Sequence, residues 1–158
     1  MSKNLKSTYN RIAKDWFKDH REDTWWINGT DRFISFLEPG NLVLDVGCGA
    51  GIKSKYLAEK GLKVIGIDLS EKMIEIAQKE VSDAKFLVAD ISEPLKIDEK
   101  FDGIFAQAVL LHVPKKNIKI SNMLIIRGPA FIEKFFRQTE MQGLIHRMSV
   151  RKFNSCPN

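Results

Sequence analysis

The chain has 158 residues, of which 44% are hydrophobic and 28% are charged, and this predicts a single globular domain with one core over residues 1–158. No apolar run reaches the roughly 20 residues that a membrane-spanning helix needs. The polar opening residues lack the apolar core of a signal peptide, so we expect a cytoplasmic protein.

The charged residues and the cysteines narrow the function further. The net charge is +5, and the lysines are scattered along the chain rather than gathered into one block with interleaved aromatic residues. A solvated basic surface is therefore favoured over nucleic-acid binding. The two cysteines, Cys48 and Cys156, are too few for a disulfide framework or a metal cluster, so we expect free thiols and no metal.

Residues 7–37 are predicted to be helical and to precede the sheet. The first part has apolar side chains on one helical face, namely Tyr9, Ile12, Ala13, Trp16 and Phe17. A second, shorter apolar face spans residues 33–37, after a less regular stretch that contains two tryptophans. A segment that precedes the first strand can cover the carboxyl ends of the strands, so we interpret residues 1–37 as a candidate lid.

The stretch at residues 43–51, VLDVGCGAG, predicts a buried strand that runs into a tight glycine turn. Its apolar and β-branched residues suit a parallel strand, and three glycines at alternate positions end that strand. Glycine permits positive φ angles and lets a ligand approach the backbone, so the loop is a candidate cofactor floor. A dinucleotide site needs its third glycine where Ile52 stands, whereas the third glycine here is Gly51, which counts against that class of ligand.

Helices and strands alternate after the glycine loop. In chain order we expect a helix at 52–60, a strand at 63–68, a helix from 71 to about 81, and strands at 84–90 and 101–106. Gly61 is placed to stop the first helix and Ser70 to cap the second, whose Met73, Ile74 and Ala77 face inward. This alternation predicts an α/β fold with a doubly wound, mostly parallel sheet.

Three of the predicted strands end at a carboxylate: Asp45, Asp68 and Asp90. In an open parallel sheet, ligands bind outside the carboxyl ends of the strands, so the three acids are expected to converge on one crevice. A single acid at such a place is as often a cap or a surface residue. Three of them beside a glycine loop favour a binding site.

Four motifs in this order resemble those of the class I S-adenosylmethionine (SAM) dependent methyltransferases of the small-molecule kind. They are DVGCGAG at 45–51, IGIDLSEKM at 65–73, FLVADI at 86–91 and FDGIFAQAVLLHV at 101–113. The resemblance covers about residues 38–114 and implies a Rossmann-like sheet in the order 3-2-1-4-5-7-6. It also implies SAM as cofactor, S-adenosylhomocysteine (SAH) as product, a small-molecule methyl acceptor, and a monomer or homodimer.

Matching positions carry the family's cofactor contacts over to this chain. Asp45 would fix the amino group of SAM, Asp68 would accept both ribose hydroxyls, and Asp90 with its neighbour would read the adenine edge. Met73 would pack on adenine, with a place in the helix core as an equal alternative, and Tyr9 would close over the cofactor. The complete predicted set is Tyr9, Asp45, Gly47, Cys48, Gly49, Gly51, Asp68, Leu69, Met73, Asp90 and Ile91.

A histidine and two tryptophans are candidates for the chemistry and for the acceptor. His112, just beyond the fourth strand, is a candidate general base, with a hydrogen-bonded structural role as the alternative. Trp25 and Trp26 are expected to pack the lid onto the sheet, and stacking on a substrate or on a cation is the alternative. His20 and His146 are interpreted as surface residues.

Residues 114–158 depart from the family pattern. Three strands, two helices and their connections take on the order of 60 residues, whereas this tail supplies 45 and lacks a Gly-Gly turn. We expect a fifth strand at 123–127, an amphipathic helix at 131–145 and an edge strand at 146–153. The chain thus divides into a helical segment at 1–37, a cofactor-binding core at 38–113 and an atypical tail.

The function that these features favour is methyl transfer from SAM to a small molecule by in-line displacement. The alternative is a non-catalytic or degenerate adenosyl-binding module, which the exposed edge of an incomplete sheet would allow to dimerise. A dinucleotide-dependent oxidoreductase is a weaker third hypothesis because of the misplaced glycine. The acceptor itself is not encoded in any motif of this sequence.

Overall fold

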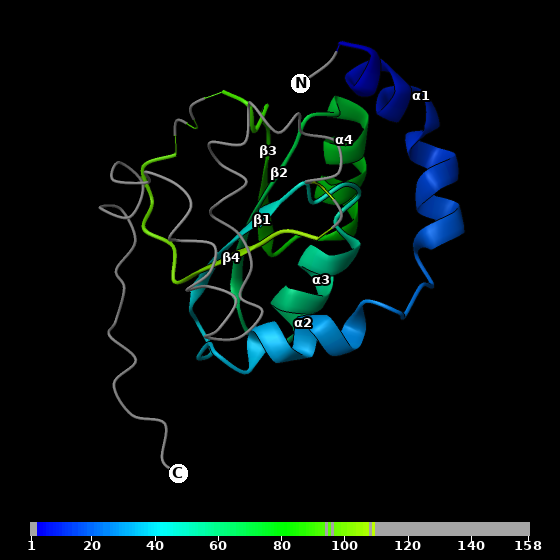
Figure 1. Cartoon of the computed structure of the whole chain (residues 1–158). Helices are drawn as coiled ribbons and strands as arrows, with labels where there is room; N and C mark the ends of the chain where they lie inside the picture. The colour runs from blue at the N-terminus through cyan, green and yellow to red at the C-terminus, as the bar shows by residue number, and fades with distance from the viewer. Residues whose placement is uncertain (1–2, 94, 96, 108, 110–158) are drawn as a thin grey trace, which may run out of the picture.

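The computed structural model describes residues 3–93, 95, 97–107 and 109 (Figure 1). The elements predicted beyond residue 110, and His112 with them, lie outside the described residues. None of the described helices is long and apolar enough to cross a bilayer.

Within the described residues, four parallel strands form the sheet. They are β1 (Leu42–Val46), β2 (Lys63–Asp68), β3 (Ala84–Val88) and β4 (Gly103–Phe105), in the spatial order β3-β2-β1-β4. Strand β1 lies in the centre, paired with β2 on one side and β4 on the other. This confirms the α/β fold and the first four places of the predicted strand order, so the carboxyl ends of β1, β2 and β3 share one edge of the sheet.

Four helices accompany the sheet: α1 (Lys3–His20), α2 (Ile27–Ile34), α3 (Ile52–Glu59) and α4 (Glu71–Glu80). Figure 1 shows α1 alongside α4, with α2 beside α3 at the other end of the domain. Helix α1 begins four residues before the predicted start at residue 7. Strands β3 and β4 are both shorter than predicted. After β3, Asp90 turns the chain by accepting hydrogen bonds from Ser92.

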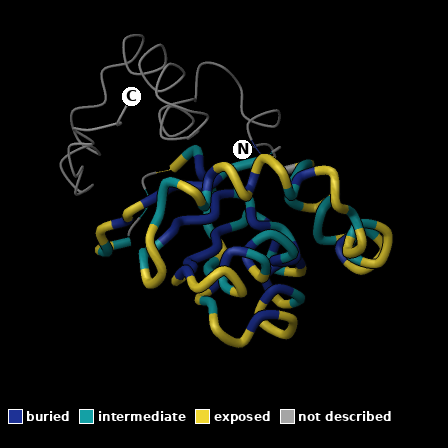
Figure 2. The backbone as a smooth tube through the Cα atoms, turned by 90° about the horizontal axis from the view of Figure 1, so that it is seen from below, coloured by how far each residue is buried: buried dark blue, intermediate teal, exposed yellow. Residues whose placement is uncertain are grey.

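Both faces of the sheet are apolar, as expected for parallel strands covered on two sides. Side chains alternate along β1, so Leu44 packs with Ile65 and Ile104 on one face, while Val43 packs with Val64 on the other. Figure 2 shows these strands as a buried interior bordered by exposed loops and outer helix faces. The second face is closed by α2 and α3, which contribute Phe33 and Leu57 to the cluster around Val43.

The two predicted helix ends are confirmed. Gly61 follows α3 with a φ of +85°, the left-handed conformation that ends helices. The Ser70 hydroxyl accepts a hydrogen bond of 3.2 Å from the backbone N–H of Met73 and so caps α4. Since Ser70 stands two residues after β2, this cap also sets the short turn from the strand into α4.

Candidate functional site

A cavity of about 150 Å³ opens at the carboxyl ends of β1 and β2. Its walls come from α1, the glycine loop, the start of α3, the end of β2 and the segments that follow β3 and β4. All the predicted cofactor-binding residues except Gly51 and Asp90 line this cavity. The structure therefore brings together residues that the sequence spreads over more than 80 positions.

The glycine loop needs its glycines for two different reasons. Gly47, Gly49 and Gly51 all have positive φ angles, between +55° and +82°. A Cβ on Gly47 would lie 2.4 Å from a methyl group of Val109, and one on Gly51 would lie 3.0 Å from the Cβ of Ala77. Gly51 thus allows α3 to approach α4, whereas Gly47 and Gly49 expose their backbone to the cavity.

Asp68 is held by backbone groups on both of its carboxylate oxygens. Its Oδ2 accepts the N–H of Gly49 at 3.0 Å, and its Oδ1 accepts the N–H of Ser70 at 2.8 Å. An ionised carboxylate is an acceptor with about four lone-pair sites, so this side chain is chemically suited to ligand hydroxyl groups. Burial and the charge of Asp68 raise the pKa of Tyr9, whose hydroxyl stays protonated beside this carboxylate.

Asp45 supplies a second carboxylate to the same cavity. It is 2% exposed, and its Oδ2 accepts a hydrogen bond of 2.6 Å from the hydroxyl of Ser54. Burial raises the pKa of Asp45 to about 6, although the Ser54 hydrogen bond and the charge of Lys53 lower it. Near neutral pH the group is therefore mostly ionised and attracts a cationic ligand group.

The arrangement matches a known family. The family model described as a methyltransferase domain matches residues 43–124, which is just over half of the chain. The chain belongs to the methyltransferase-domain family. This confirms the resemblance to class I SAM-dependent methyltransferases that the four motifs indicated.

Curated relatives of this methyltransferase domain act on different molecules. Phosphoethanolamine N-methyltransferase 1 of Zea mays is 34% identical over 144 residues, which cover 87% of this chain and 26% of that protein. Ubiquinone biosynthesis O-methyltransferase of Coxiella burnetii is 30% identical over 130 residues, covering 72% of this chain and 56% of the relative. The chain thus spans about a quarter of the plant relative and about half of the bacterial one.

Solved structures share the fold. The magnesium protoporphyrin IX methyltransferase of Synechocystis PCC 6803 with bound SAH superposes with a TM-score of 0.59 at 25% identity, covering 73% of this chain and 62% of that one. The TehB-like SAM-dependent methyltransferase of Corynebacterium glutamicum gives a TM-score of 0.62 at 23% identity, with 73% and 64% covered.

Met73 and Ile91 belong to the apolar lining of the cavity. Met73 is 1% exposed and belongs to a buried cluster with Ala13. It is therefore a core residue of α4 and a lining residue of the cavity at the same time. The carboxylate of Asp90 accepts the N–H and hydroxyl of Ser92 at 2.8 and 2.6 Å, while the residues on either side of Asp90 line the cavity. The predicted adenine contact of Asp90 stays a prediction.

Cys48 is a buried free thiol within the glycine loop, as predicted. Burial raises the pKa of this thiol well above its ordinary value, and the charges of Asp45 and Asp68 raise it further. The group therefore stays neutral at physiological pH, and its sulfur lies 3.7 Å from the carbonyl oxygen of Gly49. It contributes polarisable surface to the cavity rather than a nucleophile.

The interpretation of His20 as a surface residue was wrong. Its Nδ1 donates a hydrogen bond of 2.7 Å to the carbonyl of Trp16, and its ring stacks on the Trp16 ring at 4.5 Å between centroids. Both side chains line the cavity, together with Leu5 and Tyr9 from the same helix. Spacings of four, seven and four residues put these side chains on one face of α1, a signal that the sequence contained.

The two tryptophans have different surroundings. Trp26 is buried and packs edge-on against Tyr56 of α3, with 5.3 Å between ring centroids, which confirms a packing role. Its predicted contact with the sheet stays a prediction. For Trp25 that prediction was wrong, because its side chain is 67% exposed at the cavity and carries the ammonium of Lys53 at 5.5 Å from its ring centroid. No sequence motif indicated Lys53, which lines the same cavity.

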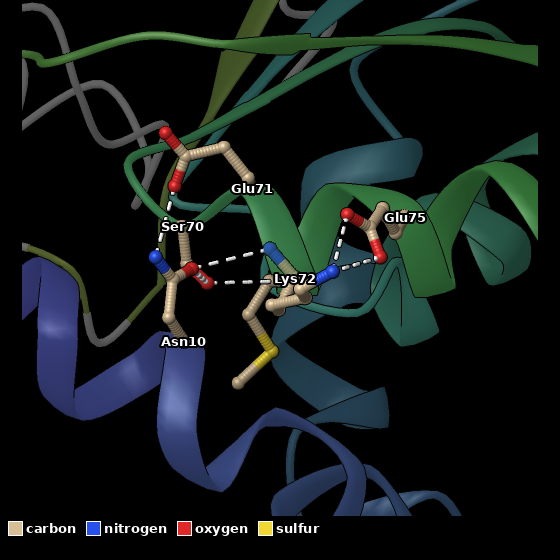
Figure 3. A network of polar contacts seen from close by, with 6 residues as sticks. Asn10, Ser70, Glu71, Lys72 and Glu75 are labelled. Carbon is tan, nitrogen blue, oxygen red and sulfur yellow. Dashed lines mark hydrogen bonds and ion pairs between the residues drawn. The ribbon is translucent and has the colours of Figure 1, made fainter.

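Helix α1 is fastened to the N-terminus of α4 by Asn10 (Figure 3). The Oδ1 of Asn10 accepts the hydroxyl of Ser70 at 2.7 Å and the N–H of Lys72 at 3.2 Å, and its Nδ2 donates to Glu71 at 2.9 Å. Glu71 also pairs with Lys6, and these bonds lower its pKa to about 2. The network holds α1 against the strand end that carries Asp68.

Proposed function

We propose that this protein transfers the methyl group of SAM to a small-molecule acceptor and releases SAH. The observation that carries the proposal is the convergence of Asp45, Asp68 and the bare backbone of the glycine loop on one cavity. Membership of the methyltransferase-domain family supports it. The relatives indicate the acceptor class, because they include a phosphoethanolamine N-methyltransferase and a ubiquinone biosynthesis O-methyltransferase.

The donor set of the cavity fits this cofactor. SAM presents a sulfonium, an amino group and two ribose hydroxyls, and carboxylates complement all of these groups. Asp45 and Asp68 line the cavity from adjacent strands, and hydrogen bonds from protein donors orient both carboxylates. A Cβ on Gly49 would be in ordinary van der Waals contact with the Trp16 ring, 3.8 Å away, so the positive φ angle rather than a clash favours glycine there.

Named residues would hold each part of the cofactor. Asp68 would accept the ribose hydroxyls, and Asp45 would accept the amino group. Met73 and Ile91 would contact the adenine ring from the apolar lining of the cavity. When bound, SAM supplies a methyl group that is already activated by its positive sulfur.

The chain's own contribution to catalysis is mainly alignment and exclusion of water. Holding an acceptor in line with the methyl group is worth several kcal/mol of barrier, and the rings of Tyr9 and Trp16 cover the cavity from α1. A general base helps only hydroxyl or protonated amine acceptors, and His112 stays the predicted base.

Residues 1–37 act as the lid and residues 38–113 as the cofactor-binding core. A cytoplasmic location and a monomeric or homodimeric state complete the proposal.

Calorimetric titration of the folded protein with SAM, SAH and NAD(H) tests the proposal. We expect micromolar binding of both adenosyl ligands and no binding of NAD(H). An acceptor screen with phosphoethanolamine and a catechol then follows, with SAH formation as the readout. Folded protein that binds neither SAM nor SAH contradicts the proposal.

A further inference from the structure

A lysine side chain enters the wall of the cavity beside Asp45. Lys53 is the second residue of α3, directly after the glycine loop, and its partly buried side chain lines the cavity. Its ammonium lies over the ring of Trp25, 5.5 Å from the centroid. A cation–π contact of this kind fixes where the charge points, although the two residues are far apart in the chain.

The ammonium forms no ion pair within 4 Å with a carboxylate of the described residues, where the ion pairs found involve other lysines and an arginine. Asp45 acts on it through its charge, which opposes the lowering of the Lys53 pKa by burial, while Oδ2 of Asp45 accepts the hydroxyl of Ser54. Partial burial of an ammonium costs free energy, and burial lowers the pKa of Lys53 accordingly. An anion in the cavity would offset that cost.

The Trp25 ring, which lies under the Lys53 ammonium, adds an apolar surface to this part of the cavity wall. A tryptophan that is 67% exposed leaves a large apolar surface in contact with water, yet here it forms part of a cavity wall. A ligand that lay against the ring would cover this surface while its charged end met Lys53. The pair is therefore suited to a molecule with an anionic group next to an apolar part.

We propose that Lys53 and Trp25 form a subsite for an anionic group, a carboxylate or a phosphate, of a ligand in the main cavity. The group has two possible carriers: the methyl acceptor, or the amino-acid end of the cofactor. In the second case, the Lys53 ammonium and the Asp45 carboxylate together match the two charges of an α-amino acid. This inference rests on the proposed function, since it assigns a residue to the same cavity.

Binding measurements on the full chain distinguish the two carriers without requiring turnover. The ligands are SAH and 5′-methylthioadenosine, which keeps the adenosine and the thioether but lacks the amino-acid end. Phosphoethanolamine and benzoate, each titrated in the presence of saturating SAH, serve as anionic acceptor probes. Lys53→Met removes the charge and keeps most of the side chain. Lys55→Met, on the exposed side of the same helix, is the matched control.

A cofactor carboxylate on Lys53 predicts that Lys53→Met binds SAH about tenfold or more weakly and binds 5′-methylthioadenosine as the wild type does. An acceptor group on Lys53 predicts unchanged SAH binding and a loss of about tenfold or more for one of the anionic probes. Trp25→Ala should weaken the same ligand, with Lys55→Met equal to wild type.

Equal binding of every ligand by Lys53→Met and the wild type overturns the subsite. A wild type that is folded and binds no SAH overturns the proposed function instead, so the two failures are separable. Thermal unfolding of each variant shows whether a loss of binding reflects a loss of fold.

Discussion

Gly49 donates its backbone N–H to Oδ2 of Asp68 over 3.0 Å, although the two residues are 19 positions apart. The other oxygen of the carboxylate accepts the N–H of Ser70 at 2.8 Å. One side chain thus joins the glycine loop after β1 to the turn after β2. Asp68 therefore stabilises the contact between these two loops in the absence of a ligand. The same hydrogen bonds orient its carboxylate toward the cavity.

Replacement of Asp68 should weaken adenosyl-ligand binding. We expect Asp68→Ala and Asp68→Asn to lower SAH affinity at least about tenfold, because each loses charge-assisted hydrogen bonds to ligand hydroxyls. Calorimetric titration gives the dissociation constants. Asp102→Ala is the control, since the carboxylate of Asp102 also accepts a backbone N–H, that of Leu42, but does not line the cavity. An unchanged dissociation constant in both Asp68 variants would remove Asp68 from the site.

The raised pKa of Asp45 predicts a pH dependence of stability. The native state binds this proton more tightly than the unfolded state, whose aspartate pKa is about 3.9. The stability that Asp45 contributes is therefore fully present below about pH 4 and is lost as the pH rises through about 6. Asp45→Asn avoids that loss, so above pH 6 it should be more stable than the wild type by on the order of 2 kcal/mol.

Thermal unfolding between pH 4 and 8 tests this prediction. At each pH, the melting temperature of the variant is compared with that of the wild type. The exposed Asp98→Asn variant changes the net charge by the same amount and is the matched control. Asp45→Asn should also bind SAH more weakly, because the neutral amide no longer attracts the cofactor's amino group. An Asp45→Asn variant that is less stable than the wild type at pH 8 would show that the buried, ionised carboxylate does not destabilise the native state.

Asn10 should matter for the stability of the domain through the contact between α1 and α4. Asn10→Ala removes three hydrogen bonds to the start of α4, two of which are partly buried and one exposed. We expect the free energy of unfolding to fall by about 1–3 kcal/mol. Lys72→Ala is the control from the same region, because its side chain pairs only with Glu75 within the exposed face of α4 (Figure 3). Surface pairs of this kind contribute about 0–1 kcal/mol, so urea unfolding curves of equal midpoint for the two variants would contradict the proposed role of Asn10.

Gly51 and Gly61 allow backbone strain to be separated from packing. Both have φ angles above +80°, so an alanine at either position pays the cost of the left-handed conformation, about 1–2 kcal/mol. At Gly51 the added Cβ also lies 3.0 Å from the Cβ of Ala77, whereas at Gly61 the nearest atom is 3.6 Å away. Gly51→Ala should therefore destabilise the protein more than Gly61→Ala in denaturant unfolding. Equal losses of unfolding free energy in the two variants would mean that α3 moves away from Ala77 without destabilising the protein.

Local patterns in the sequence were enough to predict the core of the fold. The buried strand before Gly47, the stop of α3 at Gly61 and the cap of α4 at Ser70 are all confirmed. Each of these features is encoded within about four residues, since helix caps, glycine turns and side-chain alternation depend on neighbours in the chain. The alternation of helices and strands predicted that the strands run parallel, and the family resemblance implied their order.

The sequence by itself thus determined the α/β sheet, the glycine loop and the placement of Asp45 and Asp68 at the ends of adjacent strands. Only the tertiary structure decided which face of α1 closes the cavity, why His20 belongs to it, and that Trp25 meets Lys53 rather than the core. The physical reason is the range of the interactions. A strand or a cap is stabilised by residues that are close in the chain, whereas a cavity wall is built by side chains from distant segments whose approach depends on how the whole domain packs.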